Sequence, residues 1–360
     1  MIMRIKKALF LGTLCTAVSG MSLFAQAGVS YAKSAEKTTE AASSEEAESE
    51  EETSEEVTYP ITIEHAFGET VIESKPERIA TVGWGNQDTP LALGIAPVGV
   101  SAANYGLVTD HKLHLWTDEA FADLGVEEPV VFDDVDGLDF EQISDCNPDV
   151  ILAAYSGMTQ EDYDTLSQIA PVIPYKENPW QTTWREQTIE NAEGMGMKPE
   201  GEKKVKEVED LIAEKLEEYP QLEGIPTAFC WISADDFSTF YVYLPTDPRA
   251  AYLLDLGFTL PESVQKLAGE TDDFNITVSR ENADQLDDIQ LMVVYGDEDL
   301  LKSLQEDKLM SQIPAIKNGA VALVDSTSAL AGACTPSILS IPYEIDEYLQ
   351  LLSDAAENIK

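Results

Sequence analysis

The feature that most constrains this chain is an alternation of short β-branched segments and helical patterns, from about residue 58 to the end. Residues 79–100, IATVGWGNQDTPLALGIAPVGV, are typical of a strand, a glycine-containing turn, a short helix and a second strand. Residues 139–154 repeat this geometry with a short helix, an Asn-Pro-Asp turn and an apolar strand. Repeated units of this kind build mainly parallel sheets covered by helices, so the pattern predicts an α/β fold.

One long helical pattern divides the alternation into two halves. In residues 203–219, KKVKEVEDLIAEKLEEY, the apolar side chains recur at helical spacing, and Pro220 ends the run. We therefore predict two Rossmann-like α/β lobes, residues 58–198 and 223–360, bridged by a single long connecting helix within residues 199–222. Strands are expected at 58–64, 71–73, 78–82, 98–100, 150–154, 172–175, 227–233, 240–244, 276–278, 289–294 and 321–324, with helices at 89–93, 139–144, 159–168, 248–256, 280–286, 299–309 and 341–356.

The first 57 residues have a composition unlike the rest. Residues 1–32 combine basic residues, an apolar run and small-residue sites, which predicts a signal peptide cleaved after Ala27 or Ala32. The apolar run is interrupted and marginal for a membrane span, and the residues before Cys15 make a poor lipidation site. Residues 33–57 contain ten Glu and no aromatic residue, so a disordered acidic linker is expected. We expect an exported protein of the cell surface or periplasm.

The charge balance excludes some partners. The chain has 67 acidic and 22 basic side chains and a net charge of -45, which disfavours binding to nucleic acid or to an anionic membrane surface. Cys146, Cys230 and Cys334 are odd in number and irregularly spaced, so we expect buried free thiols and neither a disulfide framework nor a zinc cluster.

Little in the sequence supports enzyme chemistry. There are three histidines, no glycine-rich nucleotide-binding motif and no serine-nucleophile motif with a partnered histidine. The closest histidines, His111 and His114, favour a polar surface turn over a metal site. We therefore expect no enzymatic activity, no catalytic residues and no protein-bound metal.

Aromatic side chains and arginines stand out at the expected strand ends and in the loops between the lobes. Aromatic rings there supply flat apolar surface, and arginine offers a planar fork for anionic oxygens. For Trp231 and Tyr241, which fall inside expected strands, packing is the competing interpretation. The set comprises Trp84, Tyr155, Trp180, Trp184, Arg185, Trp231, Tyr241, Tyr243 and Arg249.

The chain resembles the substrate-binding proteins of iron-siderophore ABC importers, a periplasmic binding protein family that also includes cobalamin and haem binders. The resemblance covers roughly residues 58–356. It is carried by KPERIATVGWGNQDTPLALGIAPVGV, SDCNPDVILAAYSGMTQEDYDTLSQIAPVIPY, NPWQTTWREQ, FYVYLPTDPRAAYLLDLGF and ITVSRENADQLDDIQLMVVY.

This resemblance implies a shallow ligand cleft between two lobes that move little. Trp84, Tyr155 and Trp180 would form apolar wall, while Arg185 and Arg249 would meet anionic groups of a ferric siderophore. The chelator would hold the iron, so no cofactor is expected. The resemblance also implies a monomer that docks on the membrane permease subunits of the importer.

The docking residues follow from the same resemblance. It implies one exposed carboxylate on each lobe, received by arginines of the permease, and the matching positions are Glu141 and Glu281. Each lies near the start of a short expected helix that precedes a buried strand. The simpler alternative is that each carboxylate only offsets the dipole of its helix.

The ligand is not determined at this stage. Arginine-rich clefts suit catecholate or citrate-type chelates and aromatic clefts also suit hydroxamates, and this chain has both kinds of residue. Haem, which usually takes an axial His, Tyr or Met ligand, and cobalamin are the alternatives within the class. A secreted enzyme on the same scaffold and a surface adhesion module are the alternatives outside it.

Overall fold

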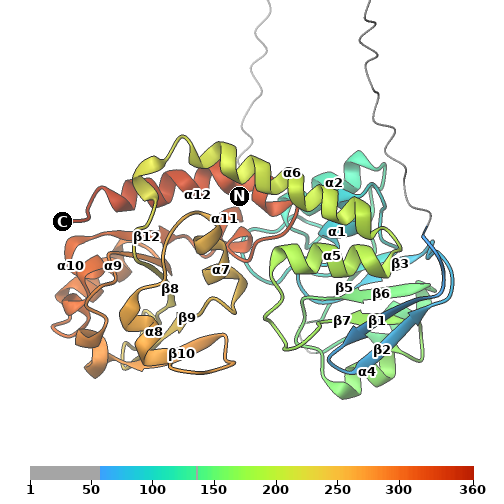
Figure 1. Cartoon of the computed structure of the whole chain (residues 1–360), viewed down its shortest axis with the longest axis horizontal. Coiled ribbons are helices and arrows are strands. Elements are labelled where there is room, and N and C mark those ends of the chain that lie inside the picture. Colours follow the sequence, from blue (N-terminus) through green and yellow to red (C-terminus); the bar gives the residue numbers. More distant parts are fainter. Residues whose placement is uncertain (1–56, 135–136) are drawn as a thin grey trace, which may run out of the picture. The chain divides into compact units, whose positions relative to one another are not determined.

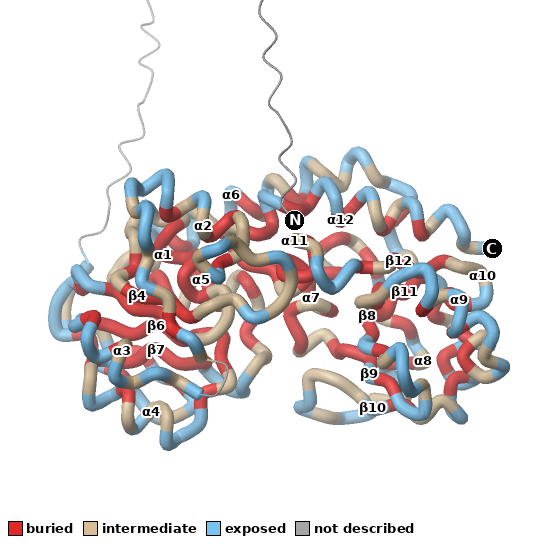
Figure 2. Tube along the Cα trace, turned by 180° about the vertical axis from the view of Figure 1, so that it is seen from behind, coloured by how far each residue is buried: buried red, intermediate tan, exposed pale blue. Residues whose placement is uncertain are grey.

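The computed structural model describes residues 57–134 and 137–360; the expected signal peptide and nearly all of the acidic linker lie outside this part. Two α/β lobes carry the described residues (Figure 1). In both lobes the central strands are buried and the outer helix faces are exposed (Figure 2). Among the described residues, no helix combines the length and apolarity needed to cross a bilayer.

The first lobe is built on a five-stranded parallel sheet in the order β5-β4-β3-β6-β7. An antiparallel hairpin of β1 (Ile61–His65) and β2 (Gly68–Ile72) precedes it. The sheet strands are β3 (Ile79–Thr81), β4 (Gly99–Ser101), β5 (Val131–Phe132), β6 (Val150–Ala153) and β7 (Val172–Pro174), and the helices are α1 (Asp88–Ala92), α2 (Leu115–Asp123), α3 (Phe140–Asp145), α4 (Gln160–Leu166) and α5 (Trp184–Gly194).

The second lobe has a mixed sheet in the order β10-β9-β8-β11-β12, in which β9 runs antiparallel to both neighbours. Its strands are β8 (Thr227–Trp231), β9 (Thr239–Tyr243), β10 (Asn275–Ser279), β11 (Leu291–Tyr295) and β12 (Val321–Val324). Its helices are α7 (Pro248–Asp255), α8 (Glu262–Ala268), α9 (Glu298–Glu306), α10 (Pro314–Asn318), α11 (Ala329–Ala333) and α12 (Ser340–Ala356), with short 3₁₀ helices η1 (Pro220–Leu222), η2 (Arg280–Gln285) and η3 (Met310–Gln312).

The long helix α6 (Lys198–Leu216) bridges the lobes (Figure 1). Near its start, Gly201 lets the helix pack closely on α5, because a Cβ there would lie 2.5 Å from the Cβ of Ala192. Further along, Val205, Val208 and Ile212 are buried in the core of the second lobe. The predicted fold class, two α/β lobes bridged by one long helix, is confirmed.

Several elements were not expected from the sequence. β5, α8, α10 and α11 have two to seven residues and show too little periodicity. Helix α5 is longer, but it buries Gln187, Thr188 and Asn191 together with apolar residues, so it has no apolar stripe. The segment expected as a helix at 280–286 is a 3₁₀ helix. The three described cysteines are buried free thiols, as predicted.

We expect His65 to make stability depend on pH. The imidazole is buried, its Nδ1 accepts from the Phe67 N–H at 3.2 Å and its Nε2 lies 2.9 Å from Thr70 Oγ1. Burial lowers the pKa of His65 below the usual 6.5. Its contribution is therefore complete above about pH 6.5 and is lost as the pH falls through that value towards the folded pKa, because the unfolded state binds the proton more readily.

His65→Gln tests this. At about pH 7.5 the variant should be less stable by about 1 to 2 kcal/mol, the value of the lost hydrogen bonds. Urea denaturation should show that this difference shrinks at about pH 5. A difference that is constant or grows at low pH would contradict the assignment.

Candidate functional site

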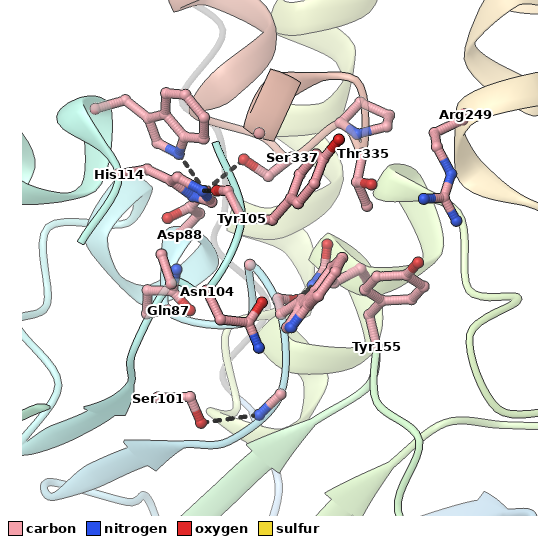
Figure 3. A pocket seen from close by; sticks show the side chains of 18 of the residues that line it. Gln87, Asp88, Ser101, Asn104, Tyr105, His114, Tyr155, Arg249, Thr335 and Ser337 are labelled. Carbon is pink, nitrogen blue, oxygen red and sulfur yellow. Dashed lines mark hydrogen bonds between the residues drawn. The ribbon is translucent and has the colours of Figure 1, made fainter. Parts of the chain in front are cut away.

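A cavity of about 220 Å³ lies between the lobes (Figure 3). It is lined by the turns that follow β3, β4 and β6 in the first lobe, and by the ends of β8, β9 and β11 and the segment 332–337 in the second. Crevices at the carboxyl ends of parallel strands are the usual place for ligands in such folds. Its aromatic lining residues are Trp84, Tyr105, Trp116, Tyr155, Trp231, Tyr243 and Tyr295.

The wall on the first lobe is held in place by Asn86, which is fully buried. Its Nδ2 donates to the carbonyls of Val82 at 2.8 Å and Tyr155 at 2.9 Å. Its Oδ1 accepts from Tyr155 N, from Gln187 Nε2 and from Asn191 Nδ2 at 3.0 to 3.2 Å. One side chain thus joins the turn after β3, the turn after β6 and helix α5, and so sets the positions of two pocket aromatics.

The turn itself requires glycine at position 83. Gly83 has a φ of +83°, and a Cβ there would lie 2.7 Å from the carbonyl oxygen of Tyr155. The close approach lets Trp84 N donate to that same oxygen at 3.2 Å. Trp84, which follows directly, therefore stands in the turn and lines the cavity.

Trp180 packs against this wall without lining the cavity. Its ring makes edge-on contacts with Trp84 at 5.7 Å and with Tyr155 at 5.3 Å between centroids. Its φ is +62°, an uncommon conformation for a bulky residue, and Gly157 leaves the room that its indole needs. The backbone is held there by Trp180 N, which donates to Ser156 O at 3.1 Å.

Arg249 is the only Lys or Arg among the residues lining the cavity, and its charge is already partnered. Its Nε and Nη2 donate to the two carboxylate oxygens of Asp247 at 2.8 and 2.7 Å, and its guanidinium lies 4.2 Å from the centroid of the Tyr243 ring. Burial acts to lower the pKa of Arg249, but the hydrogen bonds and charge of the fully buried Asp247 outweigh it and hold the pKa well above its usual value. Neither of these two guanidinium bonds uses Nη1.

Four tyrosines of the cavity lining lie close enough for the charge of Arg249 to act on their hydroxyls. Burial raises the pKa of Tyr155, Tyr243 and Tyr295, and raises that of Tyr105 to about 12. All four hydroxyls are therefore protonated near neutral pH and can donate hydrogen bonds. Tyr105 and Tyr295 also meet edge to face at 5.2 Å across the two lobes.

A buried carboxylate lies at the other end of the cavity (Figure 3). Asp88 accepts from Trp116 Nε1 at 2.9 Å, from Thr117 Oγ1 at 2.8 Å and from Ser337 Oγ, so it ties the first lobe to the segment before α12. Burial raises the pKa of Asp88, while these hydrogen bonds act to lower it.

The sequence suggested that His114 belongs to a polar surface turn. The structure instead places it at this end of the cavity. Its ring stacks on Trp116 at 4.5 Å, and its Nε2 lies 3.0 Å from the carbonyl oxygen of Tyr105. Burial lowers its pKa. His111 instead pairs with Asp118 at 2.8 Å. In the described ranges, no group of three or more His, Cys, Asp or Glu residues is placed to hold a metal ion.

Tyr241, one of the nine residues named from the sequence, does not line the cavity. Of the other eight, which were expected to bind the ligand, five line the cavity: Trp84, Tyr155, Trp231, Tyr243 and Arg249. Trp231 lies in a strand, but its side chain is 41% exposed, so the competing interpretation that it packs in the core does not hold. Trp180 stands behind the wall as described above. The remaining two, Trp184 and Arg185, lie elsewhere.

The expectation for Trp184 and Arg185 must be corrected. Trp184 is 2% exposed and its Nε1 donates to Asp255 at 3.0 Å. Arg185 pairs with Glu209 and Asp255, both at 2.6 Å, and its guanidinium lies 4.4 Å from the centroid of the Trp184 ring. A capping box starts α5 at this point, and the first turn directs both side chains towards α6 and α7.

Several lining residues were missed. Tyr295 ends an apolar strand, just as Tyr155 follows one, so the same rule would have found it. Asn104 and Tyr105 follow a strand of three residues, and Gln87 and Asp88 look like ordinary polar turn residues. Ser337 reaches the cavity only because the segment before α12 returns to the first lobe, which no local pattern indicates.

Glu141 and Glu281 are both exposed, in the first turns of α3 and η2. These short helices precede the buried strands β6 and β11, so the two carboxylates occupy corresponding places in the two lobes.

Comparison with known proteins identifies the family. Residues 79–327 match the periplasmic binding protein family. The chain is 48% identical in sequence to PiaA from Streptococcus pneumoniae, whose crystal structure was solved in complex with ferrichrome. The two structures superpose with a TM-score of 0.80, and the match covers 83% of this chain and all of PiaA in that structure. The petrobactin-binding protein YclQ of Bacillus subtilis is 25% identical over 81% of this chain and 88% of its own. A putative ABC transporter substrate-binding lipoprotein of that organism, YhfQ, is also 25% identical, over 74% and 81%.

The chain therefore belongs to the periplasmic binding protein family. Its predicted function, the substrate-binding protein of an iron-siderophore ABC importer, is confirmed at that level. The relatives are solute-binding proteins, but their names carry different ligands, so family membership does not select one.

Asn86→Asp should destabilise the protein by at least about 3 kcal/mol. The substitution keeps the shape but turns a donor of two hydrogen bonds into an acceptor facing the carbonyls of Val82 and Tyr155, and each unpaired buried group costs about 1 to 3 kcal/mol. Asn104→Asp, at an exposed pocket position, should change stability by less than about 0.5 kcal/mol. Equal denaturation midpoints for the two variants would contradict the role of Asn86.

Proposed function

We propose that this protein captures a ferric hydroxamate siderophore and delivers it to the membrane permease of an ABC importer. It acts as a monomeric binding protein and not as an enzyme. It carries no resident cofactor, because the chelator holds the iron. The observation that carries the proposal is the charge balance of an otherwise aromatic pocket.

The pocket offers little net positive charge to an anion. Its one arginine, Arg249, is paired with Asp247, and the other ionisable groups of the lining include Asp88 and His114. Three catecholates around Fe³⁺ carry an excess of negative charge, and bringing that charge beside a buried carboxylate is costly. Three singly charged hydroxamates neutralise Fe³⁺, so their complex meets no such penalty. The ferrichrome complex of the relative that is 48% identical supports the same ligand class.

The polar groups fit the oxygens of such a chelate. Arg249 can donate from Nη1, and Tyr155 and Tyr243 can donate from their hydroxyls, to hydroxamate oxygens that keep partial negative charge. Trp84 and Trp231 supply apolar wall for the carbon skeleton. Because Asp247 holds the guanidinium in place before the ligand arrives, the side chain of Arg249 loses little conformational freedom on binding.

Titration of the purified protein with ferrichrome, a ferric catecholate, haem and cobalamin tests the ligand class. Ferrichrome should quench tryptophan fluorescence saturably and bind most tightly. Tighter binding of haem, cobalamin or the catecholate would reject the hydroxamate assignment. No saturable binding of any of them would favour a different class of protein.

Arg249→Ala should weaken ferrichrome binding by about 2 to 5 kcal/mol, because it removes a buried donor to the ligand. Arg185→Ala is the matched control, since it also removes an ion-paired arginine beside a tryptophan but lies outside the pocket. Arg249→Lys keeps the charge beside Asp247 and separates loss of folding from loss of the planar fork. If Arg249→Ala and Arg185→Ala bind alike, Arg249 is not a ligand contact.

We also propose that Glu141 and Glu281 dock the protein on the permease. The double substitution Glu141→Ala/Glu281→Ala should abolish ferrichrome uptake by iron-limited cells and leave ligand affinity and melting temperature nearly unchanged. Glu161→Ala/Glu298→Ala is the control, because those two exposed carboxylates also lie in first turns of helices, one in each lobe. Normal uptake by the Glu141/Glu281 variant would exclude the docking role.

Export is the remaining part of the proposal. Residues 1–27 or 1–32 act as a signal peptide, and the mature protein begins with the acidic segment. Intact-mass analysis of the exported protein should show loss of one of these segments. A lipid on Cys15 would overturn the cleavage assignment.

A further inference from the structure

An exposed aromatic row lies on the second-lobe sheet beside the cavity. Trp231 on β8 pairs with Tyr241 on β9, which pairs in turn with Thr277 on β10. The Trp231 and Tyr241 rings lie 5.5 Å apart and nearly face each other, at 31°. We call these three residues the aromatic shelf.

The core of the lobe does not explain the shelf. Successive residues of a strand alternate between faces, so Phe229 and Tyr243 share the face of Trp231 and Tyr241. That next row is covered, with Phe229 at 0% and Tyr243 at 9% exposure, in the core cluster that includes α7 and α12. In the shelf row, Trp231 is 41% and Tyr241 39% exposed, and Thr277 is also exposed. Two large neighbouring rings left in water mark a contact surface.

The shelf continues the candidate site. Trp231 lines the cavity together with Tyr243 and Arg249, so the row starts in the pocket wall and runs outward across β9 to β10. β10 is the edge strand of this sheet and β9 is its neighbour, and both lie below α7 in the view of Figure 1. None of the three side chains carries a charge, and together they offer two flat rings and two hydroxyls.

The size of the cavity is consistent with a further contact outside it. Sites for drug-sized ligands commonly have about 300 to 1,000 Å³, and a ferric chelate with three linked hydroxamates is at least that bulky. The cavity of about 220 Å³ holds only part of such a ligand. The groups around the iron take the polar end near Arg249, and the rest of the ligand extends past the cavity rim.

We propose that the aromatic shelf binds the non-chelating periphery of the ferric hydroxamate, the linking backbone and its substituents. This inference rests on the proposed function and extends it. The pocket recognises the iron-hydroxamate centre, and the shelf selects chelates whose periphery has a flat face to lay on the rings. Tyr241, which does not line the cavity, is then a specificity-determining residue.

Tyr241→Ala should weaken ferrichrome binding about fivefold to tenfold, the scale of a contributing aromatic contact. Tyr241→Phe keeps the ring and should stay within about twofold of the unchanged protein. Leu254→Ala, which truncates an apolar side chain of equal exposure on α7, should not alter binding. Melting temperatures of all three should match that of the unchanged protein, because Tyr241 and Leu254 are exposed.

The outcomes separate the shelf from the proposed function. If Arg249→Ala weakens binding and Tyr241→Ala does not, the shelf is refuted while the ligand assignment stands. If Tyr241→Ala binds normally but loses uptake, the shelf contacts the permease and the inference is wrong. If the unchanged protein does not bind ferrichrome, the ligand assignment fails, and the shelf as its contact fails with it.

Discussion

The binding wall of the first lobe depends on the hydrogen bonds of one buried amide. Asn86 has two donor hydrogens and one acceptor oxygen, and the turns after β3 and β6 and helix α5 satisfy all of them. A carboxylate could not donate, and an apolar side chain would leave several buried groups unpaired. The turn that carries Trp84 and the turn that carries Tyr155 are therefore fixed together before any ligand arrives.

The buried charged groups of the cavity are also paired with other groups of the protein. Asp247 starts α7 as its N-cap, accepts the Arg249 backbone N–H at 2.9 Å and also pairs with the Arg249 guanidinium. At the other end Asp88 is surrounded by donors from Trp116, Thr117 and Ser337. Each buried charge is thus compensated within the protein, which suits a bulky neutral ligand better than a multiply charged one.

The lobes are joined by more than the connecting helix. Helix α6 packs on α5 at one end and enters the second-lobe core at the other. The lobes also meet at a second place. Leu107 N donates to Ser328 O, and a Cβ on Gly106 would lie 2.8 Å from the backbone nitrogen of Gly332. The two lobes are therefore connected at two separate places, and the pocket lies between the lobes.

Sequence alone determined the order of most strands and helices, the two-lobed class and five of the pocket residues, because apolar periodicity and residues at strand ends are local signals. It could not place Trp184 and Arg185, whose direction is set by the first turn of α5 against α6 and α7. Nor could it show that Asp247 neutralises Arg249, that Ser337 reaches Asp88, or that Trp231 and Tyr241 stand uncovered side by side. Those facts depend on which segments distant in the chain meet, and only tertiary packing decides that.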